Sequence, residues 1–345
     1  MIPVRVHQLD TTSTQPTLNH MKKLFRPLPT LGIFSALAMA PLMANAGEAD
    51  LSKAIVDSPT LVDPWVDTIR PISNPTHFDL AIPQTQLHPI FIHNRMPDVV
   101  DTIIGKVPVG GDYQVYAVQL ELALSERLSI NATKDGYIDF NPDNTLESTD
   151  GWANVAAGLK YAWLYQPEDQ LASNFQLLYE IPMGNQSVWQ GEGDGVFVPS
   201  IATLKHFGNF QFANQFGFKL PVDNGAESTI FYTSAHVSYK LTDWFRPLAE
   251  VSWFNVVDEG DGGARFNDHI GGALPSVVAF EAGDLVNWGA SNADLNRNFV
   301  TAALGFRVCI PDSPIDLGFA WEFPLTDQDQ GLMEDRFTVD MVIRF

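Results

Sequence analysis

The sequence predicts an all-β fold: a transmembrane, antiparallel, up-and-down β-barrel of about 12 strands. Three observations predict it. Apolar and polar residues alternate in runs of about ten to thirteen residues, the length that crosses a bilayer at a tilt. Short and long connections between these runs alternate. The chain beyond residue 46 has no long apolar run, although 45% of all residues are apolar, and in lipid only helices and closed barrels pair every backbone group.

The first 46 residues are predicted to be a secretory signal peptide. A basic start at 21–26 precedes an apolar run at 31–43 and the small residues 44–46. We expect cleavage after Ala46 and interpret residues 1–20 as a mis-called start, because Met21 opens a better signal. The alternative, an N-terminal membrane anchor, is disfavoured because Pro41 interrupts the run, which is shorter than the roughly 20 residues of a spanning helix.

The mature chain is strongly acidic. Removing four basic residues and one acidic residue with the signal peptide leaves 16 basic and 40 acidic side chains, a net charge of −24. This charge argues against nucleic acid as a partner and against docking on anionic lipid. Cys309 is the single cysteine, and no Cys/His spacing predicts a metal or a cofactor. The acidic loop 258–263 lacks the calcium-loop spacing, so we interpret it as a solvated loop that bridges cations to lipopolysaccharide.

Residues 47–85 are rich in Pro, Asp and Thr without a clear period, and we expect an irregular segment there that is a candidate plug for the barrel 86–345. The C-terminal strand alternates most clearly. Its odd positions from Phe337 to Phe345 are apolar, whereas Arg336, Asp340 and Arg344 lie on the opposite face. A β-sandwich or a small soluble barrel would also alternate, but the long runs and the aromatic residues near strand ends favour the membrane.

Twelve strands are predicted at 86–93, 112–124, 127–138, 152–164, 171–181, 195–207, 209–220, 228–241, 244–257, 297–309, 315–325 and 335–345. Tight turns fall at 125–126, 166–169, 208, 242–243 and 311–314, and longer connections at 94–111, 139–151, 182–194, 221–227, 258–296 and 326–334. The two kinds alternate without exception. Outer-membrane barrels have short periplasmic turns and longer extracellular loops, whereas a sandwich gives no reason for such sorting.

If the apolar face meets lipid, the polar face lines the lumen. The candidate lumen-lining residues carry both signs of charge and are Glu121, Lys160, Glu180, Lys219, His236, Lys240, Arg246, Glu250, Arg307, Glu322, Asp340 and Arg344. They either form ion-pair ladders that brace the wall or line a permeation path, and the sequence leaves both interpretations open. Twelve strands lie between filled barrels and wide porins, which favours a narrow pore. Phe345 is the expected assembly signal.

An enzyme is not expected. His236 with Ser234 or Ser238 comes nearest to a catalytic pair, but these residues face the lumen by parity and no Gly-x-Ser-x-Gly motif exists. Cys309 is interpreted as a small wall residue near a periplasmic turn.

Two segments, 179–184 (YEIPMG) and 239–251 (YKLTDWFRPLAEV), resemble the outer-membrane β-barrel transporter family associated with the meta-cleavage pathway of phenol degradation. The resemblance covers most of the chain from about residue 86 and brings no catalytic residues. It implies passive uptake of small, hydrophobic or aromatic solutes across the outer membrane of a Gram-negative bacterium. The alternative is a structural or adhesive barrel that acts through its acidic loops, especially 258–296. The expected partners are outer-membrane lipid and lipopolysaccharide, the barrel assembly machinery and a small solute.

Overall fold

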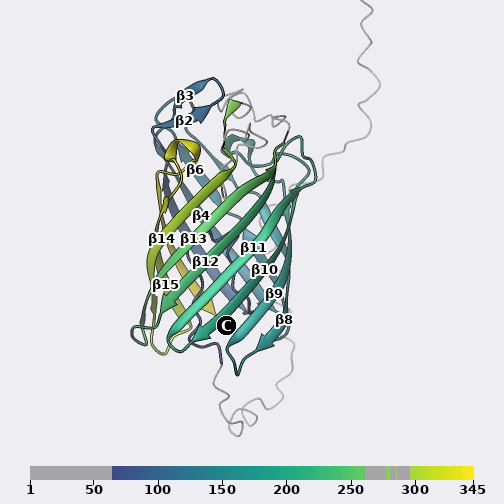
Figure 1. Ribbon diagram of the computed structural model, residues 1–345, viewed down its shortest axis with the longest axis vertical. Coiled ribbons are helices and arrows are strands. Elements are labelled where there is room, and N and C mark those ends of the chain that lie inside the picture. Colours follow the sequence, from purple (N-terminus) through teal and green to yellow (C-terminus); the bar gives the residue numbers. More distant parts are fainter. Residues whose placement is uncertain (1–63, 261–276, 280–284, 286–295) are drawn as a thin grey trace, which may run out of the picture. The chain divides into compact units, whose positions relative to one another are not determined.

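The computed structural model describes residues 64–260, 277–279, 285 and 296–345. The expected signal peptide and the first part of the expected irregular segment, 47–63, lie outside these residues. The described chain forms a closed, antiparallel β-barrel (Figure 1). The main sheet contains 14 strand segments, and two pairs of segments each form one interrupted wall strand. The wall therefore has twelve strands, as predicted.

The wall strands are β1 (Gln86–Arg95), β4 (Asp112–Ala123), β5 (Leu128–Lys134) with β6 (Tyr137–Asn141), β7 (Thr149–Trp152) with β8 (Val155–Gln166), β9 (Leu171–Ile181), β10 (Val196–Phe207), β11 (Phe210–Pro221), β12 (Thr229–Tyr239), β13 (Phe245–Asp258), β14 (Asn298–Cys309), β15 (Ile315–Pro324) and β16 (Asp335–Arg344). A separate hairpin, β2 (Val99–Thr102) with β3 (Gly105–Pro108), and two short 3-10 helices, η1 (Gln186–Val188) and η3 (Gln328–Gln330), occupy the long loops.

The barrel closes through the first and last strands. β1 pairs with β16 on one side, where Phe91 lies opposite Val339, and with β4 on the other, where Phe91 lies opposite Tyr116. β4 then pairs with both β5 and β6. Closure removes the exposed sheet edges, so every wall strand has two neighbours.

Connection lengths alternate around the barrel. Turns at 124–127, 167–170, 208–209, 240–244 and 310–314 lie at the end where β16 finishes, which is the periplasmic end of such a fold. Loops at 96–111, 142–148, 182–195, 222–228 and 325–334 lie at the opposite, extracellular end, where β13 ends and β14 begins. The predicted sorting of short and long connections is confirmed.

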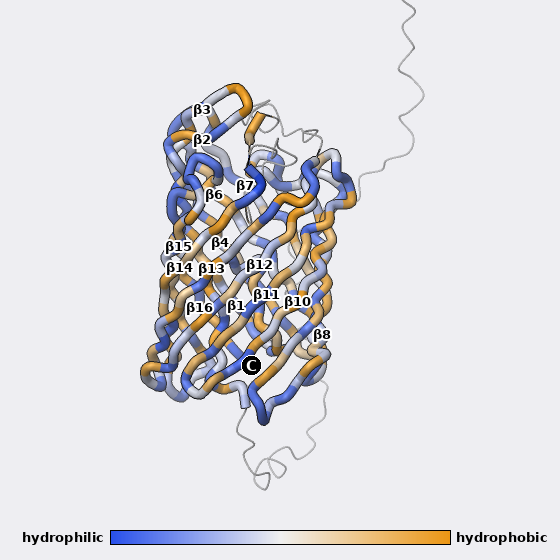
Figure 2. Tube along the Cα trace, in the orientation of Figure 1, coloured by the Kyte–Doolittle hydropathy of each residue, from blue (hydrophilic) through white to orange (hydrophobic). Residues whose placement is uncertain are grey.

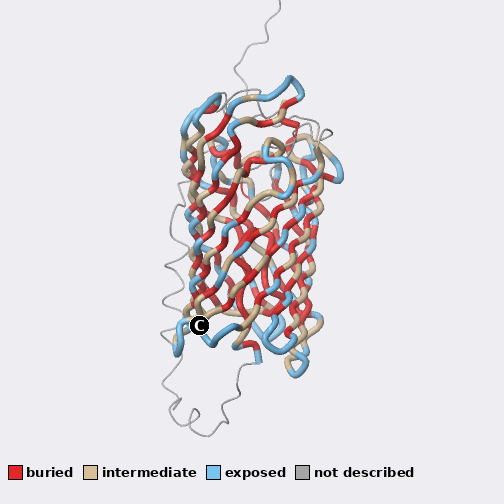
Figure 3. Tube along the Cα trace, turned by 60° about the vertical axis from the view of Figure 1, so that its left-hand side comes forward, coloured by how far each residue is buried: buried red, intermediate tan, exposed pale blue. Residues whose placement is uncertain are grey.

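Alternation along each strand separates an outer from an inner face (Figures 2 and 3). On β8, Leu159 and Tyr161 are 54% and 50% exposed, whereas Lys160 between them is completely buried. Exposed apolar side chains thus form the outer belt, and polar side chains fill the interior. This arrangement is the inverse of a soluble protein and is expected where the solvent is lipid.

Two wall strands are interrupted, which the sequence pattern did not predict. The third expected strand breaks at Asp135 and Gly136, and the fourth breaks at Ala153 and Asn154. Gly136 has φ +122, a conformation that only glycine adopts readily. No helix in the described parts of the chain is long and apolar enough to cross a membrane.

Candidate functional site in the barrel lumen

The predicted lumen residues lie on the inner face of the wall. Ten of the twelve are buried in the barrel interior: Glu121, Lys160, Glu180, Lys219, His236, Arg246, Glu250, Arg307, Glu322 and Asp340. The other two, Lys240 and Arg344, are partly exposed and line the periplasmic mouth. The structure therefore gathers all twelve around one interior.

Most of the interior charges are paired. Lys160 Nζ lies 2.7 Å from Asp79 Oδ2 and 2.9 Å from Glu121 Oε1. Arg307 lies 2.9 Å from Asp340, whose second partner is His88 at 2.6 Å. Because desolvation makes an unpaired interior charge costly, such networks hold their members in fixed positions.

Residues 64–85 run through this interior and supply many of the partners. Asp79 belongs to this segment, and so does Arg70, which pairs with Asp79 at 2.8 Å. Near the mouth, Asp67 contacts Lys240 and Arg246, each at 2.8 Å. Burial raises the pKa of Asp67, but these two cations outweigh burial and leave the pKa below its usual range. The segment is therefore fixed by ion pairs at the mouth and in the middle of the lumen.

Glu250 on β13 is the main contact between wall and segment. Its carboxylate accepts hydrogen bonds from the backbone N–H groups of Ile72 and Ser73 and from the Ser73 hydroxyl. His236 Nδ1 lies 2.7 Å from the same carboxylate. Glu250 thus joins two wall strands to the inserted segment.

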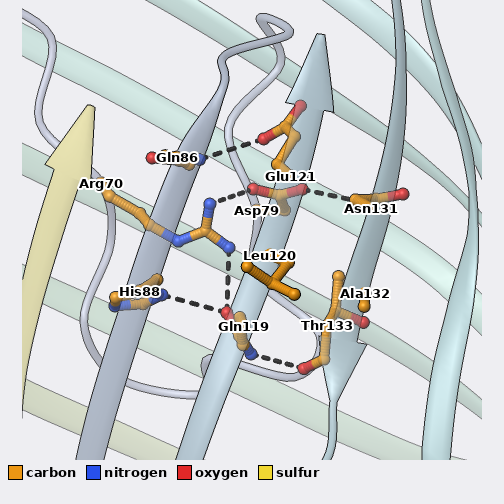
Figure 4. A pocket seen from close by; sticks show the side chains of 10 residues that line it. All are labelled: Arg70, Asp79, Gln86, His88, Gln119, Leu120, Glu121, Asn131, Ala132 and Thr133. Carbon is orange, nitrogen blue, oxygen red and sulfur yellow. Dashed lines mark hydrogen bonds and ion pairs between the residues drawn. The ribbon is translucent and has the colours of Figure 1, made fainter. Parts of the chain in front are cut away.

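A small cavity lies between the segment and strands β1, β4 and β5 (Figure 4). Its volume of about 10 Å³ matches a single water molecule. Among the described residues, four polar atoms on its lining have no hydrogen-bond partner: Arg70 Nε, Gln86 Oε1, Asn131 Oδ1 and Thr133 Oγ1. These donors and acceptors suit one bridging water.

A larger cavity of about 460 Å³ opens at the periplasmic mouth. Lys240, Arg246 and Arg344 line it together with Asp67 and Asp316. Cys309 lies on the same lining, at the inner face near the β14–β15 turn, as parity predicted. The cavity marks where residues 64–67 enter the lumen.

Near the long loops, buried apolar side chains form two clusters beside ion pairs such as Lys134 with Glu180. One cluster of buried side chains combines wall residues such as Tyr113 and Phe140 with Val188 and Trp189 of the β9–β10 loop. A second cluster joins Tyr232 to residues of β9, β10, β13 and β14. Phe140 contacts the rings of both Tyr113 and Trp189 at 6.2 Å between centroids. The end of the lumen near the long loops therefore combines aromatic packing with buried ion pairs.

Several interior residues escaped the sequence analysis. Lys134 lies inside and pairs with Glu180 at 2.5 Å, because a register shift between Ala132 and Lys134 reverses its parity. Arg70 and Asp79 lie in a segment without a period, so no sequence signal placed them. Gln211 does lie on the predicted polar face, but an uncharged amide gave no reason to select it.

The nearest candidate for a catalytic pair is not assembled in the described part of the chain. His236 bonds to Glu250, while Ser234 Oγ lies 2.8 Å from Ser252 Oγ and accepts from Asn74 at 3.0 Å. Over the same residues, no group of three or more His, Cys, Asp or Glu side chains is arranged to hold a metal ion.

Residues 92–299 match the family model described as "Putative MetA-pathway of phenol degradation". The chain belongs to this family. The match spans most of the wall, from β1 to the start of β14, and agrees with the resemblance carried by residues 179–184 and 239–251. A search among curated proteins finds no sequence match.

Solved structures with this fold are outer-membrane proteins. The crystal structure of the COG4313 outer membrane channel from Pseudomonas putida F1 superposes with a TM-score of 0.54 at 10% identity, covering 81% of this chain and 100% of that chain. The NanC porin gives a TM-score of 0.46 at 6% identity, covering 75% of this chain and all of that one. At these identities, the first likeness shows that this family member shares the barrel fold.

Proposed function

We propose that this family member is an outer-membrane channel for the passive passage of small, hydrophobic or aromatic solutes, and that residues 64–85 close its lumen at rest. The observation that supports it most directly is the cluster of buried aromatic side chains near the long loops, which includes Tyr113, Phe140 and Trp189. Aromatic rings bind small apolar and aromatic molecules through area burial and ring contacts. The family and the channel structure with the same fold support this proposal.

Passage then has two stages. A solute first enters from the long-loop end and packs among the aromatic side chains. It then meets the ionic middle, where Asp79, Lys160 and Glu250 hold the inserted segment. Since the segment fills this level of the lumen, it must move before the solute reaches the periplasmic mouth.

The proposed surroundings follow from the outer face. Exposed apolar residues such as Leu159 and Leu304 contact outer-membrane lipid, and the extracellular loops contact lipopolysaccharide. Phe345 is 84% exposed and is proposed as the side chain that the barrel assembly machinery recognises. We propose no catalytic role, and no cofactor. The alternative, an adhesive barrel, depends on loop 258–296, most of which lies outside the described residues.

Single-channel recording in planar bilayers tests the proposal. We expect the full-length protein to rest closed and to pass ion current in openings during which residues 64–85 leave the lumen, and we expect phenol but not glycerol to interrupt these openings. Phe140→Ser, which removes an inward ring, should weaken the phenol block about tenfold, the effect of about 1.4 kcal/mol of lost contact. Tyr116→Ser is the matched control, because Tyr116 is 54% exposed on the outer face. A protein that passes no current and allows no liposome swelling by any solute would refute the channel.

A further inference from the structure

The wall contacts the backbone of the inserted segment as well as its side chains. The contacting side chains come from strands around the barrel, and their targets are main-chain N–H and C=O groups between residues 67 and 84. The wall residues concerned are Gln119, Glu121, Asn174, Gln211, Gln215, Arg246, Glu250, Arg307 and Arg344. Backbone groups are the same in every peptide, so these contacts do not depend on which side chains the segment carries.

Gln211 shows the pattern most clearly. Its amide oxygen accepts from Ile69 N–H at 2.8 Å, and its amide nitrogen donates to Ile69 C=O at 2.7 Å. One side-chain amide therefore pairs with both polar groups of one residue, as a neighbouring β-strand would. Gln211 is 3% exposed, so this pairing takes place away from bulk water.

Other strands repeat the pattern along the segment. Glu250 accepts from Ile72 N–H at 3.0 Å and from Ser73 N–H at 2.7 Å. Gln215 accepts from Asp79 N–H at 2.6 Å. Asn174 donates to the carbonyl of Leu80 at 3.1 Å. These amide and carboxylate groups thus satisfy a non-helical backbone that would otherwise carry unpaired buried groups.

Two carboxylates of the segment act as anchors. Asp67 is held at the mouth by Lys240 and Arg246, and Asp79 is held in the middle by Lys160 at 2.7 Å. The wall therefore supplies a row of backbone partners, with one basic position at the mouth and one in the middle. This combination fits a non-helical, turn-containing peptide with acidic side chains at both positions.

We propose that the lumen wall is a binding site for an irregular, turn-containing oligopeptide with two acidic side chains at the spacing of Asp67 and Asp79. In the structure, this chain's own residues 67–84 occupy the site. A separate peptide of the same kind takes their place when the segment leaves. The proposal is independent of the solute channel proposed above, because it concerns a different ligand and a different level of the lumen. Tethering through Thr85 gives the native segment an effective concentration in the millimolar range, so a free peptide competes only when the native segment is weakened.

A full-length double variant provides the test. Asp67→Ala with Asp79→Ala removes both anchors from the segment and leaves the wall intact. The probe is a fluorescein-labelled synthetic peptide with the native sequence of residues 64–85, added to the detergent-solubilised variant and followed by fluorescence anisotropy. We expect saturable binding to the variant and at least tenfold weaker apparent binding to the native protein, whose own segment competes.

Two further peptides distinguish recognition of the backbone from nonspecific binding. Methylation of the Ile69 and Ser73 backbone nitrogens removes the N–H donors that bond to Gln211 and Glu250, and each loss should weaken binding about tenfold. A peptide carrying the two alanine substitutions should also bind at least tenfold more weakly. Equal binding by the methylated peptide overturns the proposal. The proposal is also overturned if the native peptide does not bind a folded variant, one whose heated and unheated samples still migrate differently in detergent gels. If the double variant does not fold, Ile69→Pro in the full chain replaces it, with the same outcomes deciding.

Discussion

Lys160 holds two carboxylates in the barrel interior. It is completely buried between Asp79 and Glu121. We predict that Lys160→Met destabilises the protein by about 3–5 kcal/mol, the effect of breaking a buried ion pair, with the value at the lower end because Arg70 still pairs with Asp79. Equilibrium urea unfolding in detergent measures this.

Lys205→Met is the matched control for Lys160. The Lys205 ammonium donates to a backbone carbonyl near the periplasmic turn and has no carboxylate partner among the described side chains. We therefore expect the control to change the unfolding free energy by no more than about 0.5 kcal/mol. Equal losses in the two variants would contradict the role assigned to the buried ion pairs.

Glu227 in the β11–β12 loop makes the stability of the protein depend on pH. Burial raises its pKa to about 7 from an ordinary value of 4.5, although Lys219 and Lys134 favour its charged form. Because the folded state binds this proton more tightly than the unfolded state does, stability falls as pH rises from about 4.5 to about 7 and is level above that window. We predict that Glu227→Gln removes this slope. The difference between variant and native unfolding free energies at pH 4.5, 6 and 8 measures it, and a constant difference would contradict the prediction.

At the scale of single elements, the interruption between β5 and β6 depends on one glycine. A Cβ on Gly136 would lie 2.8 Å from the Tyr116 carbonyl oxygen, at a φ of +122 that L-residues avoid. We predict that Gly136→Ala costs about 1–3 kcal/mol for the backbone conformation alone, with the clash in addition. Gly208→Ala is the control, because Gly208 also has positive φ (+60) but has open space around its Cα. Samples are heated stepwise, and the temperature at which the faster-migrating band of the folded barrel disappears from a detergent gel is compared between the two variants. Equal decreases in this temperature would rule out the steric role assigned to Gly136.

The elements that the sequence predicted well are the uninterrupted ones. β9 spans Leu171–Ile181, the range expected from its alternation, because period-two patterning is a local property of the chain. The register shift before Lys134 cannot be predicted in this way, since a single extra residue reverses the facing of all later residues in the strand without changing composition. The position of Asp79 is also hidden, because its partners on β5 and β8 lie far away in the sequence. The alternation of inward and outward side chains along the strands therefore identified wall residues of the site. The segment that they hold was identified only by the three-dimensional fold.

At the scale of the whole molecule, the two faces of the wall require different surroundings. The side chains exposed on the outer face are mostly apolar, while buried ion pairs cross the interior. In water this arrangement would expose a large apolar surface, whereas in a bilayer it places each face in its preferred solvent. Stability should therefore depend on how deep in the membrane a substitution on the outer face lies.

We predict that Leu304→Arg costs about 2–4 kcal/mol in a phospholipid bilayer, and Phe207→Arg no more than about 1 kcal/mol. Leu304 lies in the middle of β14 and is 55% exposed, whereas Phe207 ends β10 beside a short turn and is 63% exposed. Both side chains point outward, so exposure alone predicts equal effects, while depth in the bilayer predicts unequal ones. Reversible unfolding in liposomes measures the two free energies. The difference should vanish in detergent micelles, which adapt around an arginine, and equal costs in the bilayer would show that this belt does not span the hydrocarbon core.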